Sequence, residues 1–255
     1  MNPGEHEVMS RVEETHWWYR GLRDVITRCL REPRFQLPPS PHVLDAGCGT
    51  GQNLKILGEL LQPAYLGGFD ISEEGLGIAQ HKLPGADLYQ SDLANPSLHV
   101  GELDLAVSLD VICIPGVQRA REGLKCIVAA LRPGGLFVLN LPAYDWLYSE
   151  HDTAVHTTER YTAHRVRALL KSLDLRVELL CYRLFFLFPL VVLRRLPSLM
   201  RARPGDPGAR SDLHAVPAEL TNRSLLAVLK FENQLIARGG RLPWGSSVFA
   251  IGRKA

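Results

Sequence analysis

The sequence of 255 residues has few cysteines, and these lack the spacing that a disulfide framework or a zinc site requires. The five cysteines are scattered, odd in number and contain no CxxC pair. This pattern is typical of reduced thiols, so we expect no structural metal and a cytoplasmic location.

An excess of charge of one sign is also missing. The 29 lysines and arginines nearly balance the 27 aspartates and glutamates, which gives a formal net charge of +2. A chain with so small an excess attracts polyanions only weakly, and we therefore expect no nucleic-acid partner.

The hydrophobic runs are short. The longest is LFFLFPLVVL, residues 184–193, which Pro189 interrupts. Because a bilayer-spanning helix needs about 20 apolar residues, we interpret this run as part of the core or of a pocket wall. Peripheral membrane contact is the alternative, since four arginines follow the run, namely Arg194, Arg195, Arg201 and Arg203. The first residues, MNPGEHEVMS, lack the cationic start and the apolar run of a signal peptide.

From residue 42 to about 140, short apolar runs alternate with helical patterns. This rhythm predicts an α/β fold, with a doubly wound, Rossmann-like and mostly parallel seven-stranded sheet that carries helices on both faces. The expected strands are residues 42–47, 64–70, 87–92, 103–110, 136–142, 175–184 and 246–254. We divide the chain into an N-terminal helical lid, residues 1–35, and a main domain, residues 36–255. A helical insertion at about 185–243 precedes the last strand of that domain.

The stretch LDAGCGTG, residues 44–51, carries glycines at alternate positions behind Asp45. Glycines such as Gly47 and Gly49 let a strand turn sharply into a helix while the backbone approaches a nucleotide closely. A dinucleotide site has the spacing GxGxxG, whereas the spacing here is GxGxG. We expect Asp45 to face ligand charge, where it would repel a pyrophosphate and attract an ammonium and a sulfonium. S-adenosylmethionine carries both of these cations.

Two further aspartates end the next predicted strands. Asp70 is placed to accept both ribose hydroxyls of an adenosine, and Asp92 to accept from the adenine amino group. Either aspartate alone could be a helix cap. Together with the glycine motif, they predict an S-adenosylmethionine site.

These motifs resemble a known family. VLDAGCGTG, FD and SDL are similar to the first three motifs of the class I S-adenosylmethionine-dependent methyltransferases. HWWYRGLR near the start and ENQLIARGGRLPWGSS before the last strand resemble a bacterial group that methylates small molecules. The resemblance implies that the following residues hold the cofactor: Gly47, Gly49, Asp70, Ile71, Asp92 and Leu93, with Leu109 and Asp110 near its methionine end. A cofactor-binding or membrane-associated protein without catalysis is the alternative.

The segment before the first strand is rich in aromatic residues. Val8, Val12, His16 and Tyr19 follow one helical stripe, with Trp17 and Trp18 beside it. We expect this segment to act as a lid that closes over cofactor and acceptor and excludes water. The alternative is that the tryptophans only pack on the core.

Residues 148–162, YSEHDTAVHTTERYT, follow the fifth strand, at the sheet edge where ligands bind. An acceptor hydroxyl must lose its proton, and a neutral histidine suits that step near pH 7. We predict His151 as the general base, His156 as the alternate and Asp152 as the group that orients the imidazole. Arg160 and Tyr161 are expected to bind the acceptor or cap the next helix.

The prediction is therefore O-methylation of an apolar small molecule. C- or N-methylation remains open, and so does an ordinary solvated loop at residues 148–162. No metal is expected, because the fifth strand runs into NLPAY instead of a second carboxylate site.

Overall fold

The computed structural model describes residues 4–199 and 215–255, so Arg201 and Arg203 lie outside the described residues. The described part of the chain forms a seven-stranded sheet in the order β3-β2-β1-β4-β5-β7-β6. Its strands are β1 (His42–Ala46), β2 (Tyr65–Asp70), β3 (Asp87–Gln90), β4 (Leu103–Leu109), β5 (Leu131–Pro142), β6 (Leu175–Arg183) and β7 (Ser247–Lys254). β7 runs antiparallel to both neighbours, and the other pairs are parallel. The predicted doubly wound, mostly parallel sheet is thus confirmed.

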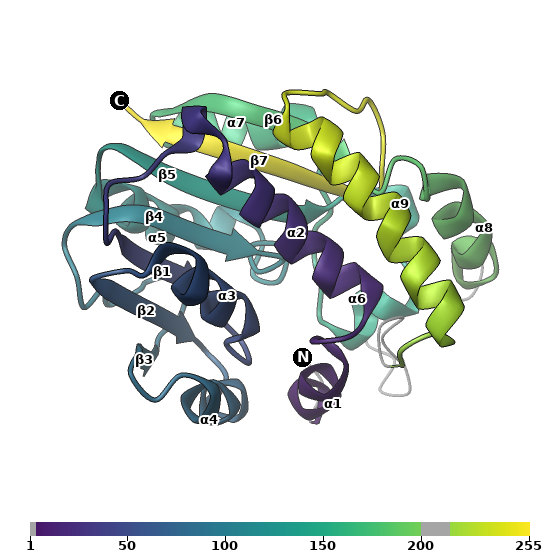
Figure 1. Ribbon diagram of the computed structural model, residues 1–255, viewed down its shortest axis with the longest axis horizontal. Coiled ribbons are helices and arrows are strands. Elements are labelled where there is room, and N and C mark those ends of the chain that lie inside the picture. Colours follow the sequence, from purple (N-terminus) through teal and green to yellow (C-terminus); the bar gives the residue numbers. More distant parts are fainter. Residues whose placement is uncertain (1–3, 200–214) are drawn as a thin grey trace.

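Helices cover both faces of this sheet (Figure 1). They are α1 (Glu5–Val12), α2 (Trp17–Arg31), α3 (Gln52–Leu61), α4 (Glu73–Lys82), α5 (Val117–Ala130), α6 (Glu150–Ala154), α7 (Ala163–Ser172), α8 (Phe188–Leu199) and α9 (Glu219–Ala237), with short 3-10 turns η1 (Pro33–Phe35) and η2 (Asp145–Leu147). Successive strand residues point to opposite faces. Val43 therefore belongs to the core on the face that α2, α3 and α9 cover, whereas Leu44 belongs to the core on the face that α5 and α7 cover. The expected insertion consists of α8 and α9, which lie between β6 and β7.

The N-terminal segment differs from the predicted single stripe. The chain leaves the helical path after Val12 and re-enters it at Trp17, with His16 as the N-cap of α2. A second difference concerns β5, which begins at Leu131 because this residue pairs with Leu103 across a register shift. The strand therefore starts five residues earlier than the sequence pattern indicates.

The apolar run at residues 184–193 is divided between core and surface. Leu184 and Leu187 are buried, whereas Leu190 and Leu193 are exposed on α8. Within the described ranges, no helix has both the length and the apolar character needed to cross a membrane.

Candidate active site

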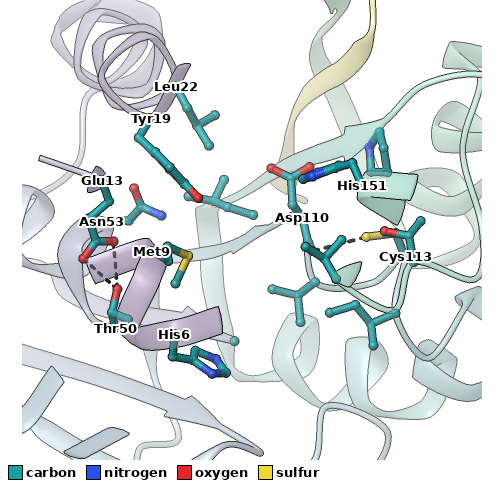
Figure 2. A pocket seen from close by; sticks show the side chains of 18 of the residues that line it. His6, Met9, Glu13, Tyr19, Leu22, Thr50, Asn53, Asp110, Cys113 and His151 are labelled. Atoms are coloured by element: carbon teal, nitrogen blue, oxygen red, sulfur yellow. Dashed lines mark hydrogen bonds between the residues drawn. The ribbon is translucent and has the colours of Figure 1, made fainter. Parts of the chain in front are cut away.

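A cavity of about 800 Å³ lies at the carboxyl ends of β1, β2 and β4. Parallel strands deliver their following loops to this edge of the sheet, which is why ligands bind there in doubly wound folds. Figure 2 shows two sides of the cavity, with Thr50 and Asn53 on one and Asp110 and His151 on the other. We call the side formed by the glycine loop and the end of β2 the cofactor end. The acceptor end is formed by α6, α8 and the loop that holds Arg160.

The glycine loop between β1 and α3 has the backbone that only glycine adopts easily. Gly47 and Gly49 have φ values of 91° and 51°. A Cβ atom on Gly47 would lie 2.4 Å from Val111, so the position cannot hold a side chain without rearrangement. The loop is tied to β2, because Gly49 donates its N–H to Asp70 Oδ2 at 2.8 Å. Asp70 Oδ1 accepts from the N–H of Ser72 at 2.9 Å, which fixes the carboxylate at the cavity wall.

The other predicted cofactor contacts also reach the cavity. Asp92 is exposed and lines it, with Oδ1 accepting from Ala94 N–H at 2.9 Å. Ile71 and Leu93 line the same end, and Ile71 is 66% exposed despite its apolar side chain. Two carboxylates and two apolar side chains match what an adenosine offers, namely hydroxyl and amino donors and a flat ring. Their contact with a ligand stays a prediction.

Asp45 does not face the cavity as expected. Its side chain is buried within the sheet, and Oδ2 has no hydrogen-bond partner among the described residues. Burial, reinforced by the charge of Asp70, raises the pKa of Asp45 to about 8. Asp45 therefore lies outside the cavity lining and is mostly neutral at pH 7, so it does not present the negative charge to a ligand that the sequence led us to expect.

α1 closes the cofactor end with residues that the sequence patterns did not single out. Glu13, which follows α1, is buried and accepts from the hydroxyl of Thr50 at 2.7 and 2.9 Å (Figure 2). The same carboxylate contacts the ammonium group of Lys82 on α4. His6 and Met9 also line this end. The N-terminal segment is thus anchored on the glycine loop and on α4.

The aromatic segment at the start of α2 lines the cavity with all four of its predicted residues, namely His16, Trp17, Trp18 and Tyr19. His16 is buried and its Nδ1 accepts from Trp18 N–H at 3.2 Å. Burial, together with the charge of Arg194, lowers the pKa of His16 to about 4. His16 is therefore neutral at pH 7, and its proton lies on Nε2. Burial and the charges of Glu13 and Asp110 raise the pKa of Tyr19, so its phenol stays protonated.

Asp110 lies at the end of β4 with a left-handed φ of 60° and lines the cavity beside the buried Leu109. Asn140 Nδ2 donates to both of its carboxylate oxygens, at 3.0 and 2.8 Å. Asn140 Oδ1 in turn accepts from Nη1 of the fully buried Arg183 at 3.1 Å. Burial raises the pKa of Asp110 to about 6, whereas Asn140 and the charges of Arg183 and Arg160 oppose that rise. The carboxylate is thus largely ionised at pH 7.

The two predicted histidines lie in different places. His151 lines the cavity and projects toward the region of Asp110 (Figure 2). His156 has a left-handed φ of 60°, is exposed, and does not belong to the cavity lining. Desolvation lowers its pKa. The structure therefore does not support His156 as the alternate base, because the turn after α6 directs it to the surface.

Asp152 and Tyr161 have structural contacts. Asp152 is buried, accepts from Ser149 N–H at 2.9 Å to cap α6, and pairs with Arg160 Nη1 at 2.6 Å. Its carboxylate is thereby committed to a cap and an ion pair, which argues against the predicted role of orienting an imidazole. Tyr161 is buried outside the cavity lining and donates its hydroxyl to Glu159 at 3.0 Å. Arg160 does line the cavity, and its Nε donates to the carbonyl of Ala143 at 2.9 Å.

Comparisons with known proteins give the following similarities. Residues 43–135 match the methyltransferase domain family. Trans-aconitate 2-methyltransferase of Paracidovorax citrulli is 30% identical over 128 residues, which are 49% of this chain and 48% of that protein. The chain spans about half the length of the curated relatives it matches.

Solved structures share the fold over the whole chain. A TehB-like S-adenosylmethionine-dependent methyltransferase from Corynebacterium glutamicum has a TM-score of 0.55 at 16% identity, covering 100% of both chains. The [4+2]-cyclase SpnF has the same TM-score and identity, and 91% of this chain and 81% of that chain are covered. At this identity the likeness shows the fold alone.

Proposed function

We propose that this chain, whose residues 43–135 match the methyltransferase domain family, is a class I S-adenosylmethionine-dependent methyltransferase that methylates a hydroxyl of an apolar small molecule. The observation that carries the proposal is the shared cavity. It joins the glycine loop and Asp70 at one end to Asp110 and His151 at the other. One ligand can therefore lie against the cofactor-binding motifs while a second reaches a side chain able to take a proton.

The cofactor end has the donors and acceptors that S-adenosylmethionine requires. The carboxylate of Asp70, held by two backbone N–H groups, would accept from the ribose hydroxyls. Asp92 would accept from the adenine amino group, with Ile71 and Leu93 against the ring. The ionised Asp110 would attract the cofactor's positive charges. When bound, S-adenosylmethionine supplies an electrophilic methyl group on a positively charged sulfur.

His151 has the role of proton acceptor. When the acceptor oxygen takes up a methyl group from the cofactor, the imidazole of His151 would accept the proton of the hydroxyl. General base catalysis of this kind contributes roughly 10²–10⁴-fold in rate. Trp17, Trp18 and Tyr19 would keep water out, which favours a step in which positive charge leaves the sulfur.

A carboxylate acceptor is the second candidate. The relatives named for methylation of trans-aconitate favour it, since that compound carries carboxylates. A carboxylate is already ionised at pH 7 and needs no base. N- or C-methylation and cofactor binding without methyl transfer are the further alternatives, because one fold serves many functions.

Three further proposals stand beside this function. Residues 1–35 act as a lid on a domain of residues 36–255 whose insertion is at about 185–243. The protein is cytoplasmic, which its free cysteines support. Peripheral membrane contact through α8 is supported by the exposed Leu190 and Leu193.

The experiment is methyl transfer from labelled S-adenosylmethionine to a panel of hydroxyl and carboxyl acceptors, with two histidine variants. With a hydroxyl acceptor, His151→Ala should lower kcat by about 100-fold or more and leave S-adenosylhomocysteine affinity unchanged. His156→Ala is the matched control and should stay close to the unaltered protein, because its side chain is exposed. Near-normal turnover of a hydroxyl acceptor by His151→Ala would remove the base role.

A further inference from the structure

The acceptor end of the cavity is unusually rich in positive charge. Arg160, Arg194 and Arg195 all line it, from the loop after α6 and from α8. The carboxylate of Asp152 lies 2.6 Å from Arg160 Nη1 and 3.6 Å from Arg195 Nη1. Arg195 Nη1 also donates to the carbonyl of Leu147 at 2.8 Å. Arg160 and Arg195 are therefore held in place by these contacts, whereas Arg194 is exposed.

Arg194 differs from the other two arginines in its contacts. Arg160 and Arg195 share the carboxylate of Asp152, and Asp110 is engaged by Asn140 at the junction with the cofactor end. Arg194 has no ion-pair partner among the residues that the structure describes. Its guanidinium is exposed and lines the cavity, so it is open to an anionic group of a ligand.

The surroundings of the arginines are apolar. Leu184, Val191 and Val155 line the same part of the cavity, with Trp17 facing it from α2. His16 adds no positive charge, because its imidazole is neutral at pH 7. A ligand that fits this end would thus combine an apolar body with a negatively charged group.

We propose that Arg194, together with Arg160 and Arg195, binds an oxyanion on the acceptor, a carboxylate or a phosphate monoester. The planar forks of arginines match the paired oxygens of both groups and form charge-assisted hydrogen bonds to them. The proposal rests on the proposed function and deepens it, since it states which acceptors the cavity selects. The anion is a recognition group, and the nucleophile is a separate oxygen beside the cofactor.

The test is calorimetry on the full chain with four probes that share a ten-carbon tail: decanoate, decyl phosphate, decanol and decyltrimethylammonium. Each probe is titrated with and without saturating S-adenosylhomocysteine. We expect at least one anionic probe to bind about tenfold or more tightly than decanol, and the cationic probe to bind most weakly. The better of decanoate and decyl phosphate identifies the preferred oxyanion.

The variant Arg194→Gln should reduce the affinity for the preferred anionic probe by about tenfold and leave that for decanol unchanged. Arg167→Gln is the matched control, because Arg167 is exposed on α7 and lies outside the cavity lining. Equal binding of decanol and both anions would overturn the proposal. A loss of S-adenosylhomocysteine affinity in Arg194→Gln, with unchanged anion affinity, would also overturn it by assigning the arginine to the cofactor. If S-adenosylhomocysteine fails to bind the unaltered chain, the proposed function is contradicted instead. The titrations of the probes without S-adenosylhomocysteine still test the anion site in that case.

Discussion

We expect the charge state of Asp110 to control how strongly the cavity attracts a cation, because its carboxylate lines the cavity. Its carboxylate lies at the end of β4, held by Asn140, which is itself held by Arg183. Removing this carboxylate from water raises its pKa to about 6, within the range in which most proteins stay folded. S-adenosylmethionine has one positive charge more than S-adenosylhomocysteine, so the difference between their affinities reports on the charge that faces the sulfur.

We predict that the preference for S-adenosylmethionine over S-adenosylhomocysteine falls as the pH is lowered. Asp110 binds a proton progressively below a pH of about 6, and the attraction to the sulfonium disappears with its charge. The loss between about pH 7.5 and pH 5 should be on the order of tenfold, measured as the ratio of the two calorimetric Kd values.

Two variants separate Asp110 from its neighbour. Asp110→Asn should abolish this dependence on pH and show the weak preference at every pH. Asp45→Asn should keep the loss between about pH 7 and pH 5, because the pKa of Asp45 is raised to about 8 and its titration lies higher. The role of Asp110 would be refuted by an Asp110→Asn variant that retains the full pH dependence.

Single residues also show where sequence patterns succeed and fail. Asp70 and Asp92 could be placed because each follows a short apolar strand, and the carboxyl ends of parallel strands meet at one edge. The contact between Asn140 and Arg183 could not be predicted, because the two residues are 43 positions apart and meet only through the strand order β5-β7-β6. The burial of Asp45 was equally hidden, since the motif shows its neighbours in sequence and not its neighbours in the sheet.

Among the elements, the connection between α1 and α2 determines how the cavity is closed. Asn222 of α9 donates to the carbonyl of Thr15 at 2.9 Å and accepts from Trp17 N–H at 2.8 Å. The turn is thereby fixed to α9, while Glu13 attaches the end of α1 to Thr50 and Lys82. The N-terminal segment is thus fixed at α9 and is held at the glycine loop by the contacts of Glu13, which we call the latch.

We predict that Glu13→Gln weakens this latch without unfolding the protein. A neutral amide keeps the shape but loses the charge that holds Lys82, so α1 should open more often. The dissociation rate of S-adenosylhomocysteine should rise about tenfold in a stopped-flow displacement experiment, and the amides of α1 should exchange hydrogen faster.

Glu14→Gln is the matched control, since Glu14 is the next residue along the chain and is exposed. It should leave both rates unchanged. If both variants behave alike, Glu13 does not hold α1 in place.

The latch could not be predicted from the sequence VEE at residues 12–14, because adjacent glutamates at a helix end usually lie on a solvated face. The helix break was also hidden, since histidine is not a common N-cap residue.

At the scale of the whole molecule, the sheet brings distant parts of the chain to one cavity. Its wall is formed by residues within 6–22 of the N-terminal segment, by the loops after β1, β2 and β4, and by residues within 151–195. The succession of strands and helices along the chain could be predicted from the alternation of apolar runs and helical patterns. The position of α8 against the cavity could not, because its sequence fits a core helix, a pocket wall and a membrane contact equally well.

The identity of the nucleotide is the central claim, because the same fold is present in methyltransferases and in a [4+2]-cyclase. Calorimetric titration of the full chain with S-adenosylhomocysteine and with NADH tests it most directly, alongside Asp70→Asn and the exposed control Asp174→Asn. S-adenosylhomocysteine should bind and NADH should not. Asp70→Asn should cost about 2–3 kcal/mol of affinity through lost charge-assisted hydrogen bonds, and Asp174→Asn should cost nothing measurable. Binding of NADH in place of S-adenosylhomocysteine, or full S-adenosylhomocysteine affinity in Asp70→Asn, would contradict the account.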